Sequence, residues 1–562
     1  MKVLERLIAS RRMVLVGALL LAGLGATAWQ VMPRQEDPTM QERWGFIRVP
    51  FPGASATRVE RLIVKPLERE LTEVADVGRI SATARANGAF VQIEMVPDAD
   101  FTAAWDDIRD ALRRAEPEFP RGAGPLSFER QGSETEGIVY AVTGHNDPRV
   151  LALAARRVEE RLLQIPDARR VVITADPKEQ ITVTLDDGAA RRYALTPELL
   201  LSQLRDRNHG LSAGTLQAGD RTAILRVQGI EAEGDAAESE LRTLPILLPG
   251  GQAVELGEVA TVRRTVREPE AVRMRWNGEP AVAVGIVPKD GLHLTQFGQE
   301  VRTVAAELGP ELAPLTLREM SFQPDQVEER LGDLSGALLL GILVVGVLLI
   351  LTMGARLGFV VALVVPVVTL GSLAIYFFAG GVLHQISVAA FVLALGMLVD
   401  NAIVVAELTQ RKIDQGSGRR EAAIAAIREL AFPLATATGT TLAAFVPMLL
   451  ATGDVGDFTR AIPVIVMLTL TVSYLFALTL TPTLAARLLR PRNESGSHGF
   501  DAVARRLGDF AVRRRRFVLT FAIGLVALTV LAGSRVEENF FPAAGRSELL
   551  VNLQLPEGAA LD

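Results

Sequence analysis

The sequence predicts a polytopic α-helical membrane protein with a large α+β extramembrane domain built of tandem ferredoxin-like (βαββαβ) units. Hydrophobic residues make up 49% of the 562 residues, and they gather in runs of about twenty, long enough to cross a bilayer as helices. Between the first run and the others lie about 300 residues with alternating strand and helix patterns. A short internal repeat further predicts the first half of a duplicated architecture.

The first apolar run, residues 13–31, follows a short basic segment, residues 1–12. This order resembles a secretory signal peptide. However, the run is longer than the usual apolar region of such a peptide, and Gln30–Pro33 is a poor cleavage site because it lacks small residues. We therefore expect a retained first membrane helix, with the amino terminus in the cytoplasm.

Residues 32–333 form the predicted extramembrane region. Within residues 40–131, strand and helix patterns alternate in the order strand, helix, strand, strand, helix, strand, with Asn87-Gly88 as the hairpin turn. This order is that of one ferredoxin-like unit. In residues 132–333 the same order starts again at Gly137, with two successive strands expected on either side of Asp176-Pro177. A second unit followed by further α+β structure is the prediction for this part.

The membrane block begins at residue 334, and residues 334–486 are expected to hold membrane helices 2–6. A basic connection, residues 487–516, and a seventh helix, residues 517–534, follow it. Residues 535–562 would begin a second extramembrane domain. The helix connections that carry most arginines and lysines, 411–429 and 487–516, fall on the side of the amino terminus. The positive-inside rule therefore places the large domain outside the cytoplasm. The predicted spans are Leu334–Met353, Gly358–Phe378, Ile386–Ala406, Phe432–Ala451, Ile462–Leu484 and Phe517–Ser534.

The stretch Leu383–Glu407 contains the principal candidate site. Asp400 is the one charged residue in the apolar cores of all the predicted spans, and a carboxylate at that depth costs about 2.5–3.5 kcal/mol. Gly396 lies one turn before it on the same face, where a small residue lets another helix come close. Glu407 lies two turns after it, nearer the helix end. Asp400 should therefore face protein or a water-filled path.

Several classes of function are excluded or disfavoured by composition. There is no cysteine, so thiolate metal sites, thiol catalysis and disulfides are excluded. The five histidines show no ligand spacing typical of zinc, and no polybasic stretch with interleaved aromatic residues suggests nucleic acid. An intramembrane aspartyl protease would need two facing aspartates on different helices, and only Asp400 is available. We predict no enzyme activity, no cofactor and no metal site.

The internal repeat lies near the two ends of the chain. Residues 11–15 (RRMVL) open the first span, and residues 51–55 (FPGAS) follow it after a short strand. Residues 515–519 (RRFVL) open the seventh span, and a predicted strand at 548–553 precedes residues 555–559 (LPEGA). This match predicts that the chain is one half of a duplicated protein together with the opening of the next half.

Several segments together resemble the resistance-nodulation-cell division (RND) superfamily of efflux transporters. They are residues 51–60 (FPGASATRVE), 396–407 (GMLVDNAIVVAE), 436–447, 478–482 (LTLTP), 195–197 and 256–260. The resemblance implies the amino-terminal half of an inner-membrane permease, with residues 32–333 as a periplasmic porter and docking region. It further implies that the protein forms a homotrimer and works with a periplasmic adaptor protein and an outer-membrane channel. Such pumps export drugs or amphiphiles from the periplasm and inner membrane, driven by the proton-motive force.

The resemblance also assigns roles to residues. Asp400 takes the place of the proton-binding carboxylate, and Asn401 stands where many drug pumps have a second aspartate. The usual lysine counter-ion would come from a helix beyond this chain. Glu407 is either a proton-exit residue or a solvated helix end, and Asn401 is either a neighbour of the site or a hydrogen-bonding contact between helices. His384, near the outer end of the helix, stands where asparagine is common. Its near-neutral titration alone would support a role in taking up protons.

Other readings stay open at this stage. Asp400 could be held by a structural hydrogen bond between helices. A heavy-metal cation exporter, or a lipid- or protein-export relative of the same superfamily, is the alternative to a drug pump. We expect membrane lipids and a small-molecule substrate as binding partners, and we assign no substrate-binding residue.

Overall fold

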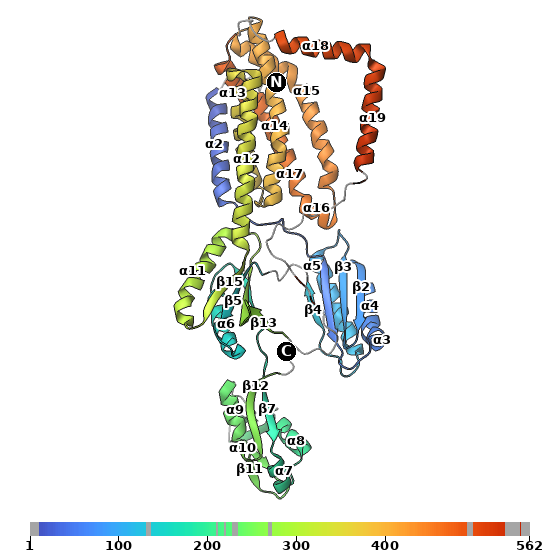
Figure 1. Ribbon diagram of the computed structural model, residues 1–562, viewed down its shortest axis with the longest axis vertical. Coiled ribbons are helices and arrows are strands. Elements are labelled where there is room, and N and C mark those ends of the chain that lie inside the picture. The colour runs from blue at the N-terminus through green and yellow to red at the C-terminus, as the bar shows by residue number, and fades with distance from the viewer. Residues whose placement is uncertain are drawn as a thin grey trace.

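The computed structural model describes residues 11–130, 136–208, 212–218, 221–226, 234–267, 272–491 and 498–533, with residues 535, 551 and 553. In this part of the chain, seven helical stretches are long and apolar enough to cross a membrane. Most of them stand side by side in a bundle, and α+β units project from one end of it (Figure 1). The chain is therefore a multi-pass membrane protein. The apolar helices are α2 (Arg11–Val31), α12 (Gln323–Met353), α13 (Ala355–Phe378), α14 (Gln385–Asp414), α15 (Arg419–Leu449), α17 (Ala461–Leu488) and α19 (Arg515–Gly533).

Close packing within the bundle depends on small residues. A side chain at Gly25 of α2 would place its Cβ 2.0 Å from the carbonyl oxygen of Leu370 in α13, so only glycine allows these two backbones to approach. A Cβ at Gly358, near the start of α13, would lie 2.4 Å from the carbonyl oxygen of Leu349 in α12. Helix α17 lies along α14, and the short helix α16 (Gly453–Thr459) joins α15 to α17.

The last two described helices are α18 (His498–Arg513) and α19. Helix α18 runs across the end of the bundle away from the α+β units, and α19 returns beside it at a distance from the other helices (Figure 1). The described side chains of α19 are all exposed. The predicted strand at 548–553 and residues 555–559 fall almost wholly outside the described residues, as do residues 1–10.

Helix α12 is longer than the predicted span, which begins at Leu334. It starts at Gln323, where Pro324 occupies the first turn and Asp325 lies near the helix amino terminus, both favourable at a helix start. The apolar pattern marks where hydrocarbon begins, whereas the helix begins eleven residues earlier. Its first turns belong to an α+β unit.

The first unit comprises residues 44–130 and has one four-stranded antiparallel sheet in the order β2-β3-β1-β4. Strands β1 and β3 alternate buried and more exposed side chains, so that Ile47 pairs with Val91 on the face toward the helices. Helices follow β1 and β3 and cover that face (Figure 1). The elements are β1 (Trp44–Pro50), α3 (Ala56–Val59), the π-helical η1 (Glu60–Val64), α4 (Lys65–Thr72), β2 (Val77–Arg85), β3 (Gly88–Met95), α5 (Phe101–Ala115), the 3-10 turn η2 (Glu116–Glu118) and β4 (Ser127–Arg130).

The second unit comprises residues 138–174 and 274–322. Its sheet has the order β13-β14-β5-β15, and β6 also pairs with β14. Strand β14 is the apolar centre, since its residues 281–287 are all buried. The elements are β5 (Ile138–Thr143), α6 (Pro148–Leu162), β6 (Ala168–Thr174), β13 (Met274–Trp276), β14 (Glu279–Pro288), α11 (Leu294–Leu312) and β15 (Thr316–Phe322).

The distal unit, residues 179–266, is inserted between the two parts of the second unit. Here the structure departs from the expected continuous second copy: β7 (Glu179–Leu185) pairs with β12 (Ala260–Val266), whereas β6 pairs with β14. The chain leaves the second unit at Ala175, whose φ of 63° turns it away. The alternating pattern predicts that a segment is a strand, but it does not predict which distant strand pairs with it. The other elements are α7 (Asp187–Tyr193), α8 (Pro197–Asn208), β8 (Ser212–Ala218), β9 (Arg221–Arg226), α9 (Gly234–Arg242), β10 (Pro245–Leu247), β11 (Ala253–Glu255) and α10 (Leu256–Val259).

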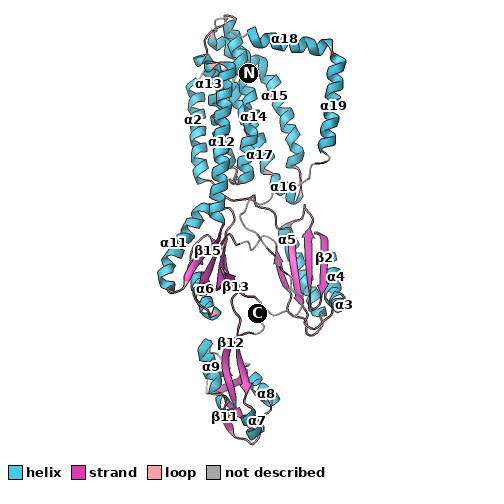
Figure 2. Ribbon diagram, viewed as in Figure 1, coloured by secondary structure: helices cyan, strands magenta, loops and turns pink. Residues whose placement is uncertain are grey.

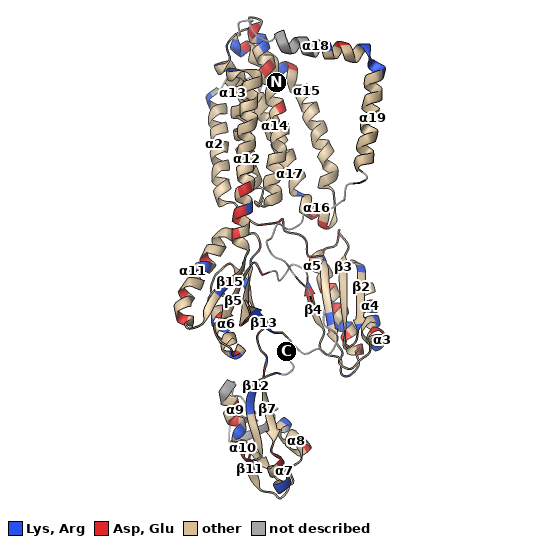
Figure 3. Cartoon of the chain, in the orientation of Figure 1, with Lys and Arg blue, Asp and Glu red and all other residues tan. Residues whose placement is uncertain are grey.

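The buried apolar residues fall into separate cores. The first unit has its own core, including Ile47, Ile63 and Ile108, and the distal unit has another. The core of the second unit, by contrast, continues through α11 and α12 into the membrane bundle. Figure 2 shows the mixed units beside the all-helical bundle, and Figure 3 shows that charged residues gather at the ends of the bundle and leave its shafts almost free of charge.

Candidate functional site

Helix α14 begins with a reciprocal cap. His384 Nδ1 accepts a hydrogen bond from the Ser387 backbone N–H at 3.3 Å, and the Ser387 hydroxyl accepts one from the His384 backbone N–H at 2.9 Å. The imidazole is 4% exposed, and burial lowers its pKa to about 4. His384 is therefore a neutral capping residue just before the span. Its lowered pKa does not give the near-neutral titration that would support a role in proton uptake.

Asp400 lies on a face of α14 that no described helix covers. Its side chain is exposed, as are Gly396 one turn before it and Val404 one turn after it. A Cβ built on Gly396 meets no atom within 4 Å, so in the described part of the chain the helix expected close to this glycine is not found. In that same part of the chain, Asp400 has neither an ion pair nor a hydrogen bond. This face of α14 is therefore accessible to lipid or to another protein segment in the membrane.

Asn401 points in a different direction from Asp400, because successive helix residues are about 100° apart. It is 7% exposed, and its amide donates a hydrogen bond to the Thr438 hydroxyl of α15 at 3.4 Å. Thr436, Thr440 and Thr441 instead bond to carbonyls of their own helix. Among these α15 threonines, Thr438 alone bonds to α14, and Asn401 acts as a contact between helices.

Near Asp400, α14 is also hydrogen-bonded to α17. The Ser473 hydroxyl, 1% exposed, donates to the Leu398 carbonyl at 2.6 Å. On α17 the next residue, Tyr474, donates its hydroxyl to the Ala431 carbonyl of α15 at 3.1 Å. Near Asp400, α14 is therefore bonded to α15 through the Asn401 side chain and to α17 through the Leu398 backbone carbonyl. The sequence pattern did not single out Ser473, because a serine in an apolar run most often bonds within its own helix.

Glu407 lies on the same side of α14 as Asp400 and is also exposed. Its carboxylate pairs with Arg411 one turn later at 3.7 Å, where both side chains are more than half exposed. Such a pair contributes about 0.3–0.5 kcal/mol. The geometry is that of a solvated helix end, and the structure brings Glu407 and Asp400 onto one face without contact.

The chemistry open to this arrangement is proton binding. A single carboxylate in an apolar helix is costly when ionised and much less so when protonated. Its neighbours in sequence are bonded to α15 and α17, so a change in how α14 packs would be passed to both helices. In the described part of the chain no group of three or more acidic or histidine side chains is arranged to hold a metal ion.

A set of polar contacts that sequence reasoning missed lies at the end of the bundle nearest the α+β units. There Arg43, just before β1, pairs with Asp454 and Asp457 of α16, each at 2.7 Å. The only signal in the sequence is two aspartates three residues apart in a short glycine-containing turn between two predicted spans. Nothing in that pattern points to an arginine 411 positions away.

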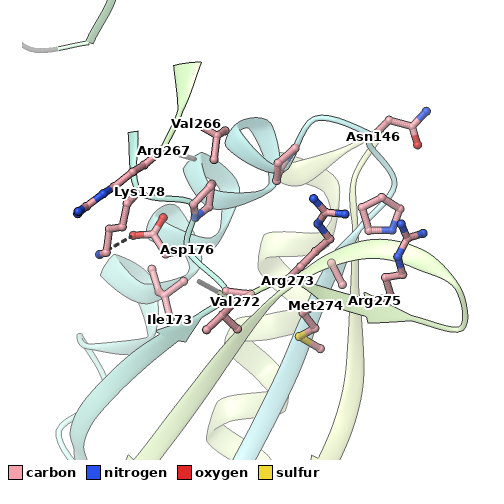
Figure 4. Close-up of a pocket in the computed structure, with 15 residues that line it drawn as sticks. Asn146, Ile173, Asp176, Lys178, Val266, Arg267, Val272, Arg273, Met274 and Arg275 are labelled. Carbon is pink, nitrogen blue, oxygen red and sulfur yellow. Dashed lines mark ion pairs between the residues drawn. The ribbon is translucent and has the colours of Figure 1, made fainter. Parts of the chain in front are cut away.

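Among the hollows lined by described residues, two differ in character. One, of about 380 Å³, lies among α2, α12, α13 and α14 and is apolar, with Trp29, Leu338 and Phe391 in its wall. The other, of about 830 Å³, lies where the chain passes between the second and distal units. Arginines and Lys178 line it, and Lys178 pairs with Asp176 at 3.7 Å (Figure 4). Neither hollow contains Asp400.

Comparison with known proteins agrees with the arrangement of helices and units. The model of the AcrB/AcrD/AcrF family matches residues 3–562. Similar curated proteins include the multidrug resistance protein MdtC of Pectobacterium carotovorum, 24% identical over 552 residues, covering 95% of this chain and 53% of the relative. MdtC of Pantoea ananatis (24%, 93% and 52%) and MdtC of Escherichia coli strain SE11 (24%, 94% and 53%) match similarly. The chain thus spans about half the length of these relatives.

Proposed function

Because the chain belongs to the AcrB/AcrD/AcrF family of RND permeases, a family of transporters, we propose that it exports drugs or amphiphiles from the periplasm and inner membrane, driven by inward proton flow. The observation that carries this proposal is Asp400. It is the one charge in the apolar cores of the predicted spans, and it lies on an exposed face of α14 between two residues that are bonded to neighbouring helices. The names of the relatives, multidrug resistance proteins, support drugs as the substrate class.

Proton binding at Asp400 would act through helix packing. The ionised carboxylate favours an arrangement of α14 that gives it water or a cation, and the protonated one tolerates an apolar neighbour. Moving one charge across 100 mV supplies about 2.3 kcal/mol. That free energy is enough to shift a two-state helix arrangement about 50-fold, since each 1.4 kcal/mol is a factor of ten.

The exposed face of α14 implies a further partner. A carboxylate left against lipid would cost about 2.5–3.5 kcal/mol, so this face is expected to pack against other membrane helices that bring a cation to Asp400. The family resemblance supports a lysine in that place, a trimeric assembly, and a periplasmic adaptor and outer-membrane channel as partners.

The proposed orientation follows from charge. The basic connections between α14 and α15 and between α17 and α19 lie at the bundle end away from the α+β units (Figure 3). The positive-inside rule then supports a cytoplasmic amino terminus, an inner-membrane location and periplasmic α+β units.

The test is Asp400→Asn, expressed from the complete native gene in an efflux-deficient Gram-negative host. Asparagine keeps the shape and cannot bind the coupling proton, so resistance to ethidium and other amphiphiles should fall to that of the empty host. The matched control is Glu407→Gln, on the same face of α14 but already solvated, which should keep resistance within about twofold because its ion pair contributes little.

Membrane levels of each variant are measured in parallel by immunoblot. Resistance retained by Asp400→Asn at normal membrane level would contradict proton coupling at this residue. Growth of the same strains on copper, zinc and silver salts decides the substrate branch: protection from metals without protection from amphiphiles would replace the drug pump by a metal exporter.

A further inference from the structure

Arg43 forms an unusual link between the first unit and the membrane bundle. Its Nη1 donates to Asp454 Oδ1 and its Nη2 to Asp457 Oδ2, both at 2.7 Å. The guanidinium is 5% exposed, whereas the side chains of Asp454 and Asp457 are 40% and 19% exposed. A buried guanidinium with two short charge-assisted bonds keeps one geometry, because leaving it unpaired is strongly unfavourable. We name the set Arg43, Asp454 and Asp457 the arginine clamp.

Neighbouring groups make further contacts with the residues of the arginine clamp. The Trp44 indole donates to Asp454 Oδ2 at 3.3 Å, and the Gln41 backbone N–H donates to Asp457 Oδ2 at 3.3 Å. The Arg43 guanidinium also lies over the Phe101 ring of α5, 5.5 Å from its centroid. The Arg43 backbone carbonyl accepts from the Met95 N–H at the end of β3. One residue therefore contacts α16, β3 and α5 at once.

The link matters because, among the described residues, the first unit and the bundle have separate apolar cores. The buried residues of the first unit form a core of their own, whereas the second unit continues into the membrane helices through α11 and α12. A movement of the bundle can reach the second unit through packed side chains. For the first unit, the routes in the described structure include the polar contacts on α16 and the chain segment after α2.

The other end of the link leads to Asp400. Helix α16 is the connection between α15 and α17, and these are the two helices bonded to α14 beside Asp400, through Thr438 and Ser473. The two helices are further bonded to each other through Tyr474. A shift of α14 that moves α15 and α17 therefore displaces α16, and the arginine clamp pulls the start of β1 with it.

We propose that the arginine clamp transmits the protonation state of Asp400 to the first unit as a rigid link that stays closed throughout the cycle. This inference rests on the proposed proton-coupled function. It assigns to Arg43 a positioning role, remote from both the proton and the substrate. Coupling through a contiguous set of contacts has to be demonstrated as coupling between sites, because position in between is not sufficient evidence.

The experiment is a double-mutant cycle read by hydrogen exchange on the purified protein from the complete gene, in detergent and without substrate. Asp400→Asn imitates the protonated state. It should change the exchange of amides in residues 44–95 by about fivefold or more, the usual size of coupling between sites. In the Arg43→Ala background the same substitution should leave residues 44–95 unchanged and still alter α15 and α17.

The matched control is Arg79→Ala. Arg79 pairs with Glu94 at 3.4 Å within the same sheet and does not reach α16, so the first unit should still respond to Asp400→Asn. A rescue variant keeps the test meaningful if Arg43→Ala folds poorly: Arg43→Glu with Asp454→Asn and Asp457→Arg rebuilds an ion pair of opposite polarity and should restore the response.

Three results would overturn the proposal: an undiminished response of residues 44–95 in Arg43→Ala, no response of the first unit in either background, or a response lost equally in Arg79→Ala. These outcomes are separate from failure of the proposed function. If Asp400→Asn keeps ethidium resistance, proton coupling itself is wrong. If Asp400→Asn loses resistance while Arg43→Ala keeps both resistance and the exchange response, only the arginine clamp is wrong.

Discussion

The first and second units are attached to the membrane bundle in opposite ways. In the second unit, α12 runs without a break from the α+β core into the bundle, and one apolar core includes Val327, Leu331 and Leu338 along this helix. In the first unit the described apolar core is separate from that of the bundle, and the bonds to α16 are polar: the ion pairs of the arginine clamp and the hydrogen bonds from Trp44 and Gln41. One attachment is made of buried area and the other of a few directed bonds.

The difference has a physical consequence for how each unit can move. Apolar packing is non-directional and is lost gradually as surfaces separate, so the second unit and the bundle should form one cooperative body. A charge-assisted bond has a defined length and direction, so the first unit should follow the movement of α16 without sharing an apolar core with the bundle. The following predictions test this contrast, from the largest expected effect to the smallest.

The largest effect is expected where the second unit meets the bundle. Val327 is fully buried in the shared core, so Val327→Asp places an unpaired carboxylate there and should cost more than about 3 kcal/mol. Both the second unit and the bundle should become sensitive to trypsin, as followed by mass spectrometry of the fragments.

The same change in the first unit is the comparison. Ile63, also fully buried, lies in the separate core, so Ile63→Asp should open residues 44–130 to trypsin and leave the membrane helices protected. Identical fragment patterns for the two variants would show that the cores are not independent.

An intermediate effect is expected on acidification, confined to the bundle side. The pKa of His384 is about 4 in the folded protein, below its ordinary value near 6.5. Between these two pH values the imidazole is protonated in the unfolded chain and neutral in the folded protein. Stability should therefore fall by about 1.4 kcal/mol per pH unit between about pH 6 and pH 4. His384→Asn keeps a capping acceptor and should flatten this slope.

The measurement is thermal unfolding in detergent at several pH values, with tryptic digestion of residues 44–130 followed separately. The first unit should show the same pH response in the wild type and in His384→Asn, because its core is separate. A slope that persists unchanged in His384→Asn would assign the pH response to another group.

The smallest effect is expected within the bundle, at the hydrogen bond between α17 and α14. Ser473→Ala removes the donor to the Leu398 carbonyl, a loss of about 0.6 kcal/mol and at most about 1.7 kcal/mol by analogy with bonds between membrane helices. Thr471 on the same helix bonds only the Met467 carbonyl of its own turn, so Thr471→Val is the matched control. Equal melting shifts for the two variants would mean that the bond to Leu398 contributes nothing.

Much of the bundle could be predicted because apolar length is a local property. The Asp400 face follows from helix geometry alone, since Gly396 and Glu407 must lie on the same side as Asp400. Helix ends are harder: α12 begins in a charged segment that no hydropathy pattern marks, and Pro324 with Asp325 is the only indication.

Pairing between distant segments could not be predicted in the same way. The partner of β7 is β12, about eighty residues later, and alternating side chains carry no information on which strand is chosen. The partners of Asn401 and Arg43 likewise depend on which helices become neighbours. Asn401 offered two readings in the sequence, and the bond to Thr438 shows what it contacts once α15 is in place.

The uninterrupted helix α12 has a mechanical consequence. Its 31 residues span about 46 Å at 1.5 Å per residue, whereas the hydrocarbon core of a bilayer is about 30 Å thick. Roughly a third of the helix therefore extends beyond the bilayer as a lever arm embedded in the second unit. A tilt of about 10° around the bilayer centre would move the far end by about 5 Å, by the same helix rise. Small rotations among membrane helices can thus become side-chain-sized displacements in the second unit without any hinge.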